Sequence, residues 1–237
     1  MEILGENLLL ILTIIILAGS VIVGAIRGFI RTFFAAFSVL IALIVATQAG
    51  PYVAKVIQHT PIYTGIVSEI EEKMDEQTDG MTDRVVDQID TISEFQIPGF
   101  VKDALIENNN SQIYEALGVY DFNEYVAAYM ACLVINAASF LIVFIMAYVV
   151  IKIIEGALNL ISKLPVLHSI NAMGGLICGL VHGLIIIWLL GVVIMALAWT
   201  GPGQWASAQI NNNPILGLIY NHNLIVLVLT NMGKMLF

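Results

Sequence analysis

Residues 126–151 read VAAYMACLVINAASFLIVFIMAYVVI, and this stretch contains no Asp, Glu, Lys or Arg. A helix rises about 1.5 Å per residue, so about 20 apolar residues cross the roughly 30 Å hydrocarbon core of a bilayer. No water is available there to bind backbone N–H and C=O groups, and a helix satisfies them within the segment. The stretch therefore predicts a membrane-spanning helix.

Three further segments lack charge over a spanning length, namely residues 7–26, 32–50 and 170–199. Hydrophobic residues make up 59% of the chain and charged residues only 11%, which excludes an ordinary soluble domain. We therefore expect an all-α integral membrane protein with four transmembrane helices.

The charges that remain indicate which side of the membrane each connection faces. Basic residues occur in the two short connections, at Arg27, Arg31, Lys152 and Lys163. Lys and Arg beside a span are retained on the cytoplasmic side, so both connections should be cytoplasmic. Of the 18 acidic residues, 15 lie between Glu69 and Glu124. This arrangement predicts two hairpins with an extracytoplasmic helical insertion and both termini outside the cell.

These segments divide the chain into four regions. Residues 1–50 and 126–200 form the two hairpins, and residues 51–125 form the acidic extracytoplasmic region. Within it, apolar residues at helical spacing predict helices over 61–77, 80–95, 101–107 and 112–117. The acids are typical of the solvated faces of such helices. The alternative is a charged module that binds a cation or a basic partner.

Residues 201–237 form a tail whose apolar stretch is too short to cross the membrane. The sequence Gly201-Pro202-Gly203 predicts a break after the fourth span, and Asn221, His222 and Asn223 divide the apolar run 215–229. We expect an interfacial or re-entrant pair of short helices. A fifth crossing is the alternative.

One face of the fourth span carries small residues at four-residue intervals. At 100° per residue this helix-packing seam comprises Asn171, Gly175, Gly179 and Gly183. Glycines spaced in this way let another helix backbone approach closely and gain dispersion contacts. The seam should therefore face into the helix bundle.

Asn136 and His182 are predicted to lie within about one turn of mid-membrane, where they could form a pair. Polar groups at that depth are costly unless paired, and they mark proton or ion paths. The alternative is structural: a neutral His182 donates one hydrogen bond to span three and fixes helix register. We favour it because a proton relay needs several titratable groups. Lys152 and Glu155 predict a surface ion pair at the end of span three.

No pattern in the chain indicates catalysis. There is no Ser/His/Asp or Cys/His nucleophile system, phosphate-binding glycine loop, zinc-ligand spacing or basic aromatic patch for nucleic acid. We expect no catalytic residues, no cofactor, no metal site and no nucleic-acid partner.

Residues 24–31, GAIRGFIR, resemble the G-x-x-R-G-F-x-R signature in the first hairpin of the CvpA family, the colicin V production proteins. The motif residues are Gly24, Arg27, Gly28, Phe29 and Arg31. Residues 163–171, KLPVLHSIN, resemble the start of the family's last span. The outer loop and tail resemble the longer members from Gram-positive bacteria. Two departures, Thr32 and Ala172, replace charged residues of many members.

The resemblance implies a multi-pass protein of the bacterial cytoplasmic membrane that functions in bacteriocin (colicin V-like toxin) production or export and in envelope maintenance. It implies no established enzyme activity. We therefore expect a non-enzymatic accessory or scaffold factor that contacts the lipid bilayer and a membrane or extracytoplasmic protein, with a homo-oligomer left open. The alternative is a small transporter or channel with Asn136 and His182 beside its path. An intramembrane enzyme is a poorer third reading.

Overall fold

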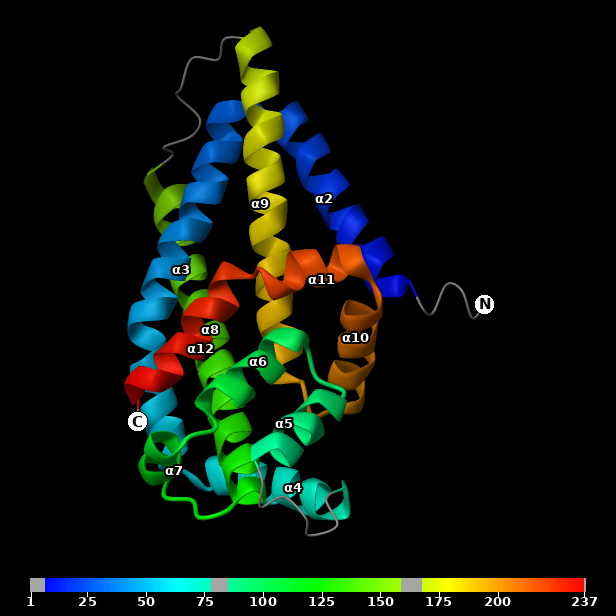
Figure 1. Ribbon diagram of the computed structural model, residues 1–237. Helices are drawn as coiled ribbons and strands as arrows, with labels where there is room; N and C mark the ends of the chain where they lie inside the picture. Colours follow the sequence, from blue (N-terminus) through cyan, green and yellow to red (C-terminus); the bar gives the residue numbers. More distant parts are fainter. Residues whose placement is uncertain (1–6, 78–84, 159–167, 237) are drawn as a thin grey trace. The chain divides into compact units, whose positions relative to one another are not determined.

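The computed structural model describes residues 7–77, 85–158 and 168–236, and within these ranges the chain is helical with no strand (Figure 1). The helices are α2 (Leu8–Arg27), α3 (Phe29–Gln58), α4 (Pro61–Gln77), α5 (Val85–Glu94), α6 (Gly99–Asn108), α7 (Ser111–Leu117), α8 (Phe122–Leu158), α9 (His168–Ala196), α10 (Gly201–Asn212), α11 (Pro214–Asn221) and α12 (Leu224–Leu236). The predicted all-α class is confirmed.

Helices α2, α3, α8 and α9 are long and apolar enough to cross a membrane, which confirms the four predicted spans. Two of them extend beyond the charge-free stretches that predicted them. Helix α3 continues through Pro51 to Gln58, and α8 begins at Phe122 and ends at Leu158. Hydropathy marks where side chains become polar, whereas a helix can continue beyond that point when its next turns pack on protein.

The chain forms two compact units. The first comprises Met1–Gly50 and Phe140–Leu190, and the second comprises Pro51–Ser139 and Gly191–Phe237. Helices α3, α8 and α9 each contribute to both units.

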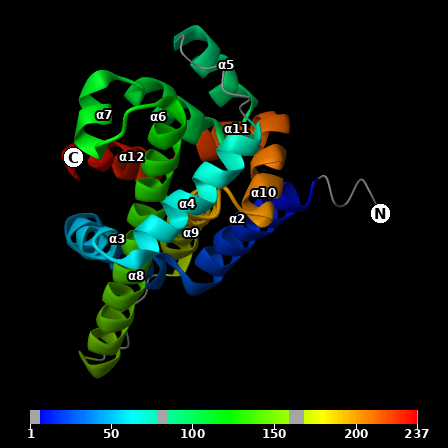
Figure 2. The same ribbon diagram turned by 90° about the horizontal axis from the view of Figure 1, so that it is seen from below.

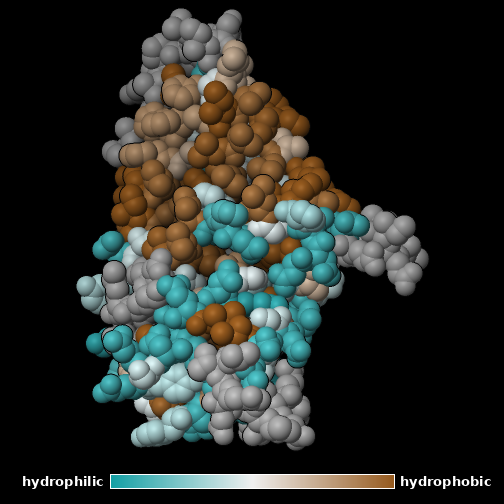
Figure 3. Space-filling view, viewed as in Figure 1, coloured by the Kyte–Doolittle hydropathy of each residue, from teal (hydrophilic) through white to brown (hydrophobic). Residues whose placement is uncertain are grey.

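The first unit has a hydrophobic surface. Figure 3 shows hydrophobic side chains over α2, α3 and α9 in this unit. Ile15, Ile26 and Met173 are each more than 60% exposed. Soluble proteins rarely expose apolar patches of this extent, because such patches are unfavourable in water. The surface is therefore suited to contact with lipid chains.

The second unit has a protein core around the first turns of α8. Tyr125, Val126, Tyr129 and Met130 are almost fully buried there. In this unit α5 packs on α6, α11 packs on α6, and α10 packs on α11. Figure 2 shows α6 and α7 next to each other, seen from below. A helix segment buried on all sides belongs in a protein core.

The acidic region has the helices that its periodicity predicts. Helix α4 has the predicted bounds, and α6 and α7 begin and end within two residues of theirs. Helix α5 begins at Val85, and the predicted start at residues 80–84 lies outside the described residues. Amphipathic periodicity identified these helices because each packs one apolar face.

The chain breaks after the fourth span as predicted, but the break lies at residues 197–200, between the end of α9 and the start of α10. Gly201-Pro202-Gly203 itself forms the first turn of α10. Thr200 caps this helix, since its hydroxyl accepts a hydrogen bond from the Gly203 N–H at 3.3 Å. Proline is favoured in a first turn because that N–H would have no helical partner.

Helices α11 and α12 divide at the predicted asparagines. The side chains of Asn213 and Asn223 cap the two helices by accepting backbone N–H groups. Asparagine is among the preferred residues at this position. None of α10, α11 and α12 is among the described helices long enough to span, so a fifth crossing is not supported.

Candidate functional site

Helices α2 and α9 meet backbone to backbone in the first unit. A Cβ on Gly24 would lie 2.8 Å from Gly179 Cα, and one on Gly175 would lie 2.8 Å from the carbonyl carbon of Gly28. Real Cβ atoms essentially never approach other atoms within 3.0 Å. The contact therefore requires glycine at these positions, and close backbone approach is how small residues stabilise helix pairs in lipid.

The other two seam residues lie at opposite ends of this contact. A Cβ on Gly183 would lie 2.9 Å from Ser20 Cβ. Asn171 lies against Gly28, and its Oδ1 accepts a hydrogen bond from the Ile30 N–H at 3.3 Å. The seam thus extends from the α2–α3 connection along α9.

Gly28 forms that connection with a φ of 78° and a ψ of 170°, a positive-φ conformation that favours glycine. The Thr32 hydroxyl donates to the Gly28 carbonyl oxygen at 2.9 Å and closes the turn from the α3 side. The Phe29 ring covers Gly174 of α9, where a Cβ would lie 2.8 Å from the ring. These motif residues therefore form the α2–α3 connection and its contact with α9, whereas Arg27 and Arg31 are exposed.

A groove of about 330 Å³ lies among α2, α3 and α9 in the first unit. Its walls are mostly aliphatic, and we call it the α2–α9 groove. Its lining residues are Ile15, Ile16, Gly19, Ser20, Val23, Gly24, Arg27, Thr32, Ala35, Gly179, His182 and Ile186.

His182 and Asn136 lie in different units. His182 lines the α2–α9 groove, and its buried Nδ1 has no hydrogen-bond partner among the described residues. Asn136 belongs to the second unit and is 6% exposed, and neither its Oδ1 nor its Nδ2 has a partner in the described part of the chain. The pairing of these two residues stays a prediction.

Sequence reasoning missed a polar cluster between α3 and α8 in the first unit. Lys152 Nζ lies 2.8 Å from Glu155 Oε2, as the three-residue spacing predicts. The Ser38 hydroxyl, which is 2% exposed, contacts the Glu155 carboxylate and lies 3.4 Å from Lys152 Nζ. The Lys152 ammonium also lies 5.4 Å from the centre of the Tyr148 ring.

The position of this cluster corrects the predicted surface ion pair. Ser38 lies nine residues beyond Phe29, which is about 14 Å along α3 at 1.5 Å per residue. The Glu155 side chain is only 17% exposed. The pair therefore lies in the last turns of α8, as predicted, but it is partly buried against α3 and not on the surface. No helical period reveals which residue of another helix faces a carboxylate, so the contact between Ser38 and Glu155 could not be predicted from the sequence.

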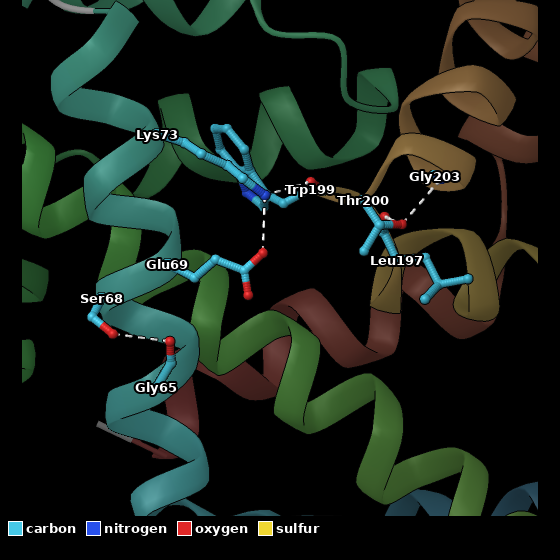
Figure 4. Close-up of polar contacts among 8 residues, drawn as sticks. All are labelled: Gly65, Ser68, Glu69, Lys73, Leu197, Trp199, Thr200 and Gly203. Atoms are coloured by element: carbon cyan, nitrogen blue, oxygen red, sulfur yellow. Dashed lines mark hydrogen bonds and ion pairs between the residues drawn. The ribbon is translucent and has the colours of Figure 1, made fainter.

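In the second unit, α4 is tied to the connection between α9 and α10 (Figure 4). Lys73 Nζ lies 3.0 Å from Glu69 Oε1 and donates to the Trp199 carbonyl oxygen at 3.4 Å. The Trp199 ring packs against the ring of Phe95, with centroids 5.4 Å apart. An acidic helix is thus fixed to the chain that follows the last span.

Burial shifts the pKa of several side chains of this unit that lie outside the spans. Burial, together with the nearby Asp121 charge, raises the pKa of Tyr114 to about 12. Burial also raises the pKa of Tyr63, and it lowers the pKa of Lys102, whose ammonium donates to the Ser93 carbonyl oxygen at 2.6 Å. In the described part of the chain, no group of three or more His, Cys, Asp or Glu residues could hold a metal ion.

A scan against protein-family models matches residues 10–77 and 117–221 to the family described as "Colicin V production protein". No curated protein and no solved structure matches the chain.

Proposed function

Because the chain belongs to the colicin V production protein family, we propose that it is a non-enzymatic accessory or scaffold factor in the production or export of a colicin V-like toxin and in envelope maintenance. Family membership and four apolar helices establish a membrane protein linked to colicin V production. The accessory role, the bacterial cytoplasmic membrane and the outward termini belong to the proposal.

The observation that carries this role is the packing of acidic helices around the buried start of α8. Tyr114 stacks on Tyr125 with ring centroids 4.9 Å apart, and the Tyr125 hydroxyl donates to the Leu105 carbonyl oxygen at 2.7 Å. Helices α6 and α7 are therefore held in place before any partner binds. A preorganised surface loses less conformational entropy on binding than a flexible loop does.

The charge of this surface indicates the chemistry of a partner. Asp103 and Glu107 line a cavity of about 140 Å³ together with Asn108 of α6 and with residues of the tail helices. Glu115 of α7 is exposed outside this cavity. Complementary charge speeds encounter and selects partners, so a protein segment rich in Lys or Arg is the expected partner. A second copy of the chain is the alternative partner.

Capture from native membranes tests this role. The full chain, crosslinked in cells and purified, should retain a heterologous protein, and the pair Asp103→Asn and Glu107→Gln should reduce that yield. Glu115→Gln removes a negative charge from the same region outside the cavity and should leave the yield unchanged. Equal loss with Glu115→Gln, or recovery of the chain alone, would count against the proposal.

A small transporter or channel is the second candidate, and the α2–α9 groove with His182 in its lining favours it. Solute flux into liposomes that contain only the purified chain would support this alternative, especially if His182→Leu abolished the flux while the chain remained folded.

A further inference from the structure

The α2–α9 groove has a single cation at one end and aliphatic side chains along the rest. Arg27 and Ile15 line it from positions twelve residues apart on α2, which corresponds to about 18 Å. The hydrocarbon core of a bilayer is about 30 Å thick. The groove therefore extends roughly the depth of one leaflet.

The positive charge of the groove has no acidic partner in the described part of the chain. Its lining includes Arg27 and no Asp or Glu, and no carboxylate in the described residues forms an ion pair with Arg27. The other polar residues of the lining are Ser20 from α2, Thr32 from α3 and His182 from α9. A guanidinium group matches the geometry of phosphate oxygens and can bind two of them at once. An anion is therefore the complement of this end.

We propose that the α2–α9 groove binds one anionic phospholipid, with its phosphate on Arg27 and an acyl chain along Val23, Ile16 and Ile186. The volume of about 330 Å³ is within the range of ligand sites. The aliphatic walls require a chain as well as a headgroup, which free phosphate lacks. The proposal does not depend on the accessory role, since a scaffold and a transporter could both hold such a lipid.

Gly19 offers a way to fill the groove without disturbing the helix contact. It lines the groove, and a Cβ there would meet nothing within 4 Å. Gly19→Leu should therefore occupy the space of the acyl chain. Gly156 of α8 is equally open but does not line the groove, so Gly156→Leu is the matched control.

The arginines of the first hairpin provide a second matched pair. Arg27 lines the groove, whereas Arg31 is exposed on the same hairpin and does not. Arg27→Gln and Arg31→Gln each remove one positive charge, so a general attraction between hairpin and membrane surface would weaken equally in both. Only a headgroup held in the groove would make Arg27→Gln weaken lipid binding more than Arg31→Gln does.

Native mass spectrometry of the purified full chain tests the proposal. The chain is incubated with equal amounts of phosphatidylglycerol and phosphatidylcholine that carry the same acyl chains. The unsubstituted chain should retain phosphatidylglycerol preferentially, and Arg27→Gln should retain roughly tenfold less, as expected for one lost charge-assisted contact. Gly19→Leu should show a similar loss, and Arg31→Gln and Gly156→Leu should show none. Equal retention of both lipids, or equal loss in Arg31→Gln, would overturn it.

Thermal unfolding gives a second readout that does not depend on Gly19→Leu folding. Phosphatidylglycerol should raise the Tm of the unsubstituted chain and of Arg31→Gln but not that of Arg27→Gln, because a ligand stabilises the state that binds it. Glycerol phosphate, which has the anion without the acyl chains, should raise none of them. An equal rise with glycerol phosphate or with phosphatidylcholine would contradict a lipid site.

Discussion

Gly24 of α2 and Gly179 of α9 are in contact through their backbones, so that a Cβ on Gly24 would lie 2.8 Å from Gly179 Cα. Lipid is as apolar as a leucine side chain, and helices in a bilayer therefore gain little by burying large aliphatic residues against each other. Close backbone contact supplies the dispersion energy instead, which explains why the smallest residues of α9 lie at its contact with α2.

Gly179→Leu should destabilise the first unit, because its added atoms would collide with the backbone of Ser20 and Val21. We expect a loss of about 1 to 3 kcal/mol, the usual cost of overpacking. Denaturant unfolding in detergent measures it. Gly156→Leu adds the same side chain where a Cβ meets nothing within 4 Å, and an equal loss there would mean that the α2–α9 contact is not the cause.

Gly28→Ala should destabilise the chain for two reasons that a double-mutant cycle separates. The positive φ of 78° with a ψ of 170° costs a residue other than glycine about 1 to 3 kcal/mol, and the new Cβ would also collide with the Asn171 side chain. In an Asn171→Ala background only the first cost should remain. If Gly28→Ala destabilised the Asn171→Ala chain as much as the unsubstituted chain, the collision with the Asn171 side chain would not contribute to the loss.

Lys152→Met should destabilise the fold more than the removal of both charges of the ion pair does. The single change leaves the partly buried Glu155 carboxylate without its cation, and the loss should be below the about 3 to 5 kcal/mol that is typical of a fully buried pair. The double variant Lys152→Met and Glu155→Gln should recover much of that loss in the same unfolding assay. If the two variants were equally unstable, the partnership of these residues would be refuted.

Tyr114 should make the second unit sensitive to alkali. Its folded pKa of about 12 exceeds the ordinary value of 10.0, because burial and the nearby Asp121 charge disfavour the phenolate. The contribution of Tyr114 to the free energy of unfolding is thus fully present below pH 10 and is lost as pH rises from 10 through 12. Unfolding midpoints across this window should fall less steeply for Tyr114→Phe, and parallel curves would rule Tyr114 out as the cause.

The sequence predicted those features that depend on residues close together in the chain. Charge-free length identified the four spans, and apolar periodicity identified α4 with its bounds. The glycine spacing located the face of α9 that packs on α2.

Features that depend on distant residues or on capping were not predicted. Ser38 and Glu155 are 117 residues apart, and only the fold brings the hydroxyl to the carboxylate. Gly201-Pro202-Gly203 has the composition of a break, yet the hydroxyl of Thr200 turns it into a helix start. Hydropathy also could not show that α3 continues through Pro51 to Gln58, because polar side chains such as Lys55 do not by themselves end a helix.

Site-specific photocrosslinking in living cells can show whether the chain is an accessory factor that presents its acidic helices to a basic partner. A photoreactive amino acid replaces exposed Glu107 of α6 in one variant and exposed Ile177 of α9 in another. If the chain is such a factor, a covalent adduct with a heterologous, Lys- and Arg-rich protein should form from position 107 and none from position 177. Adducts only between copies of the chain, or none from position 107 while the purified chain alone moves solute into liposomes, would contradict it.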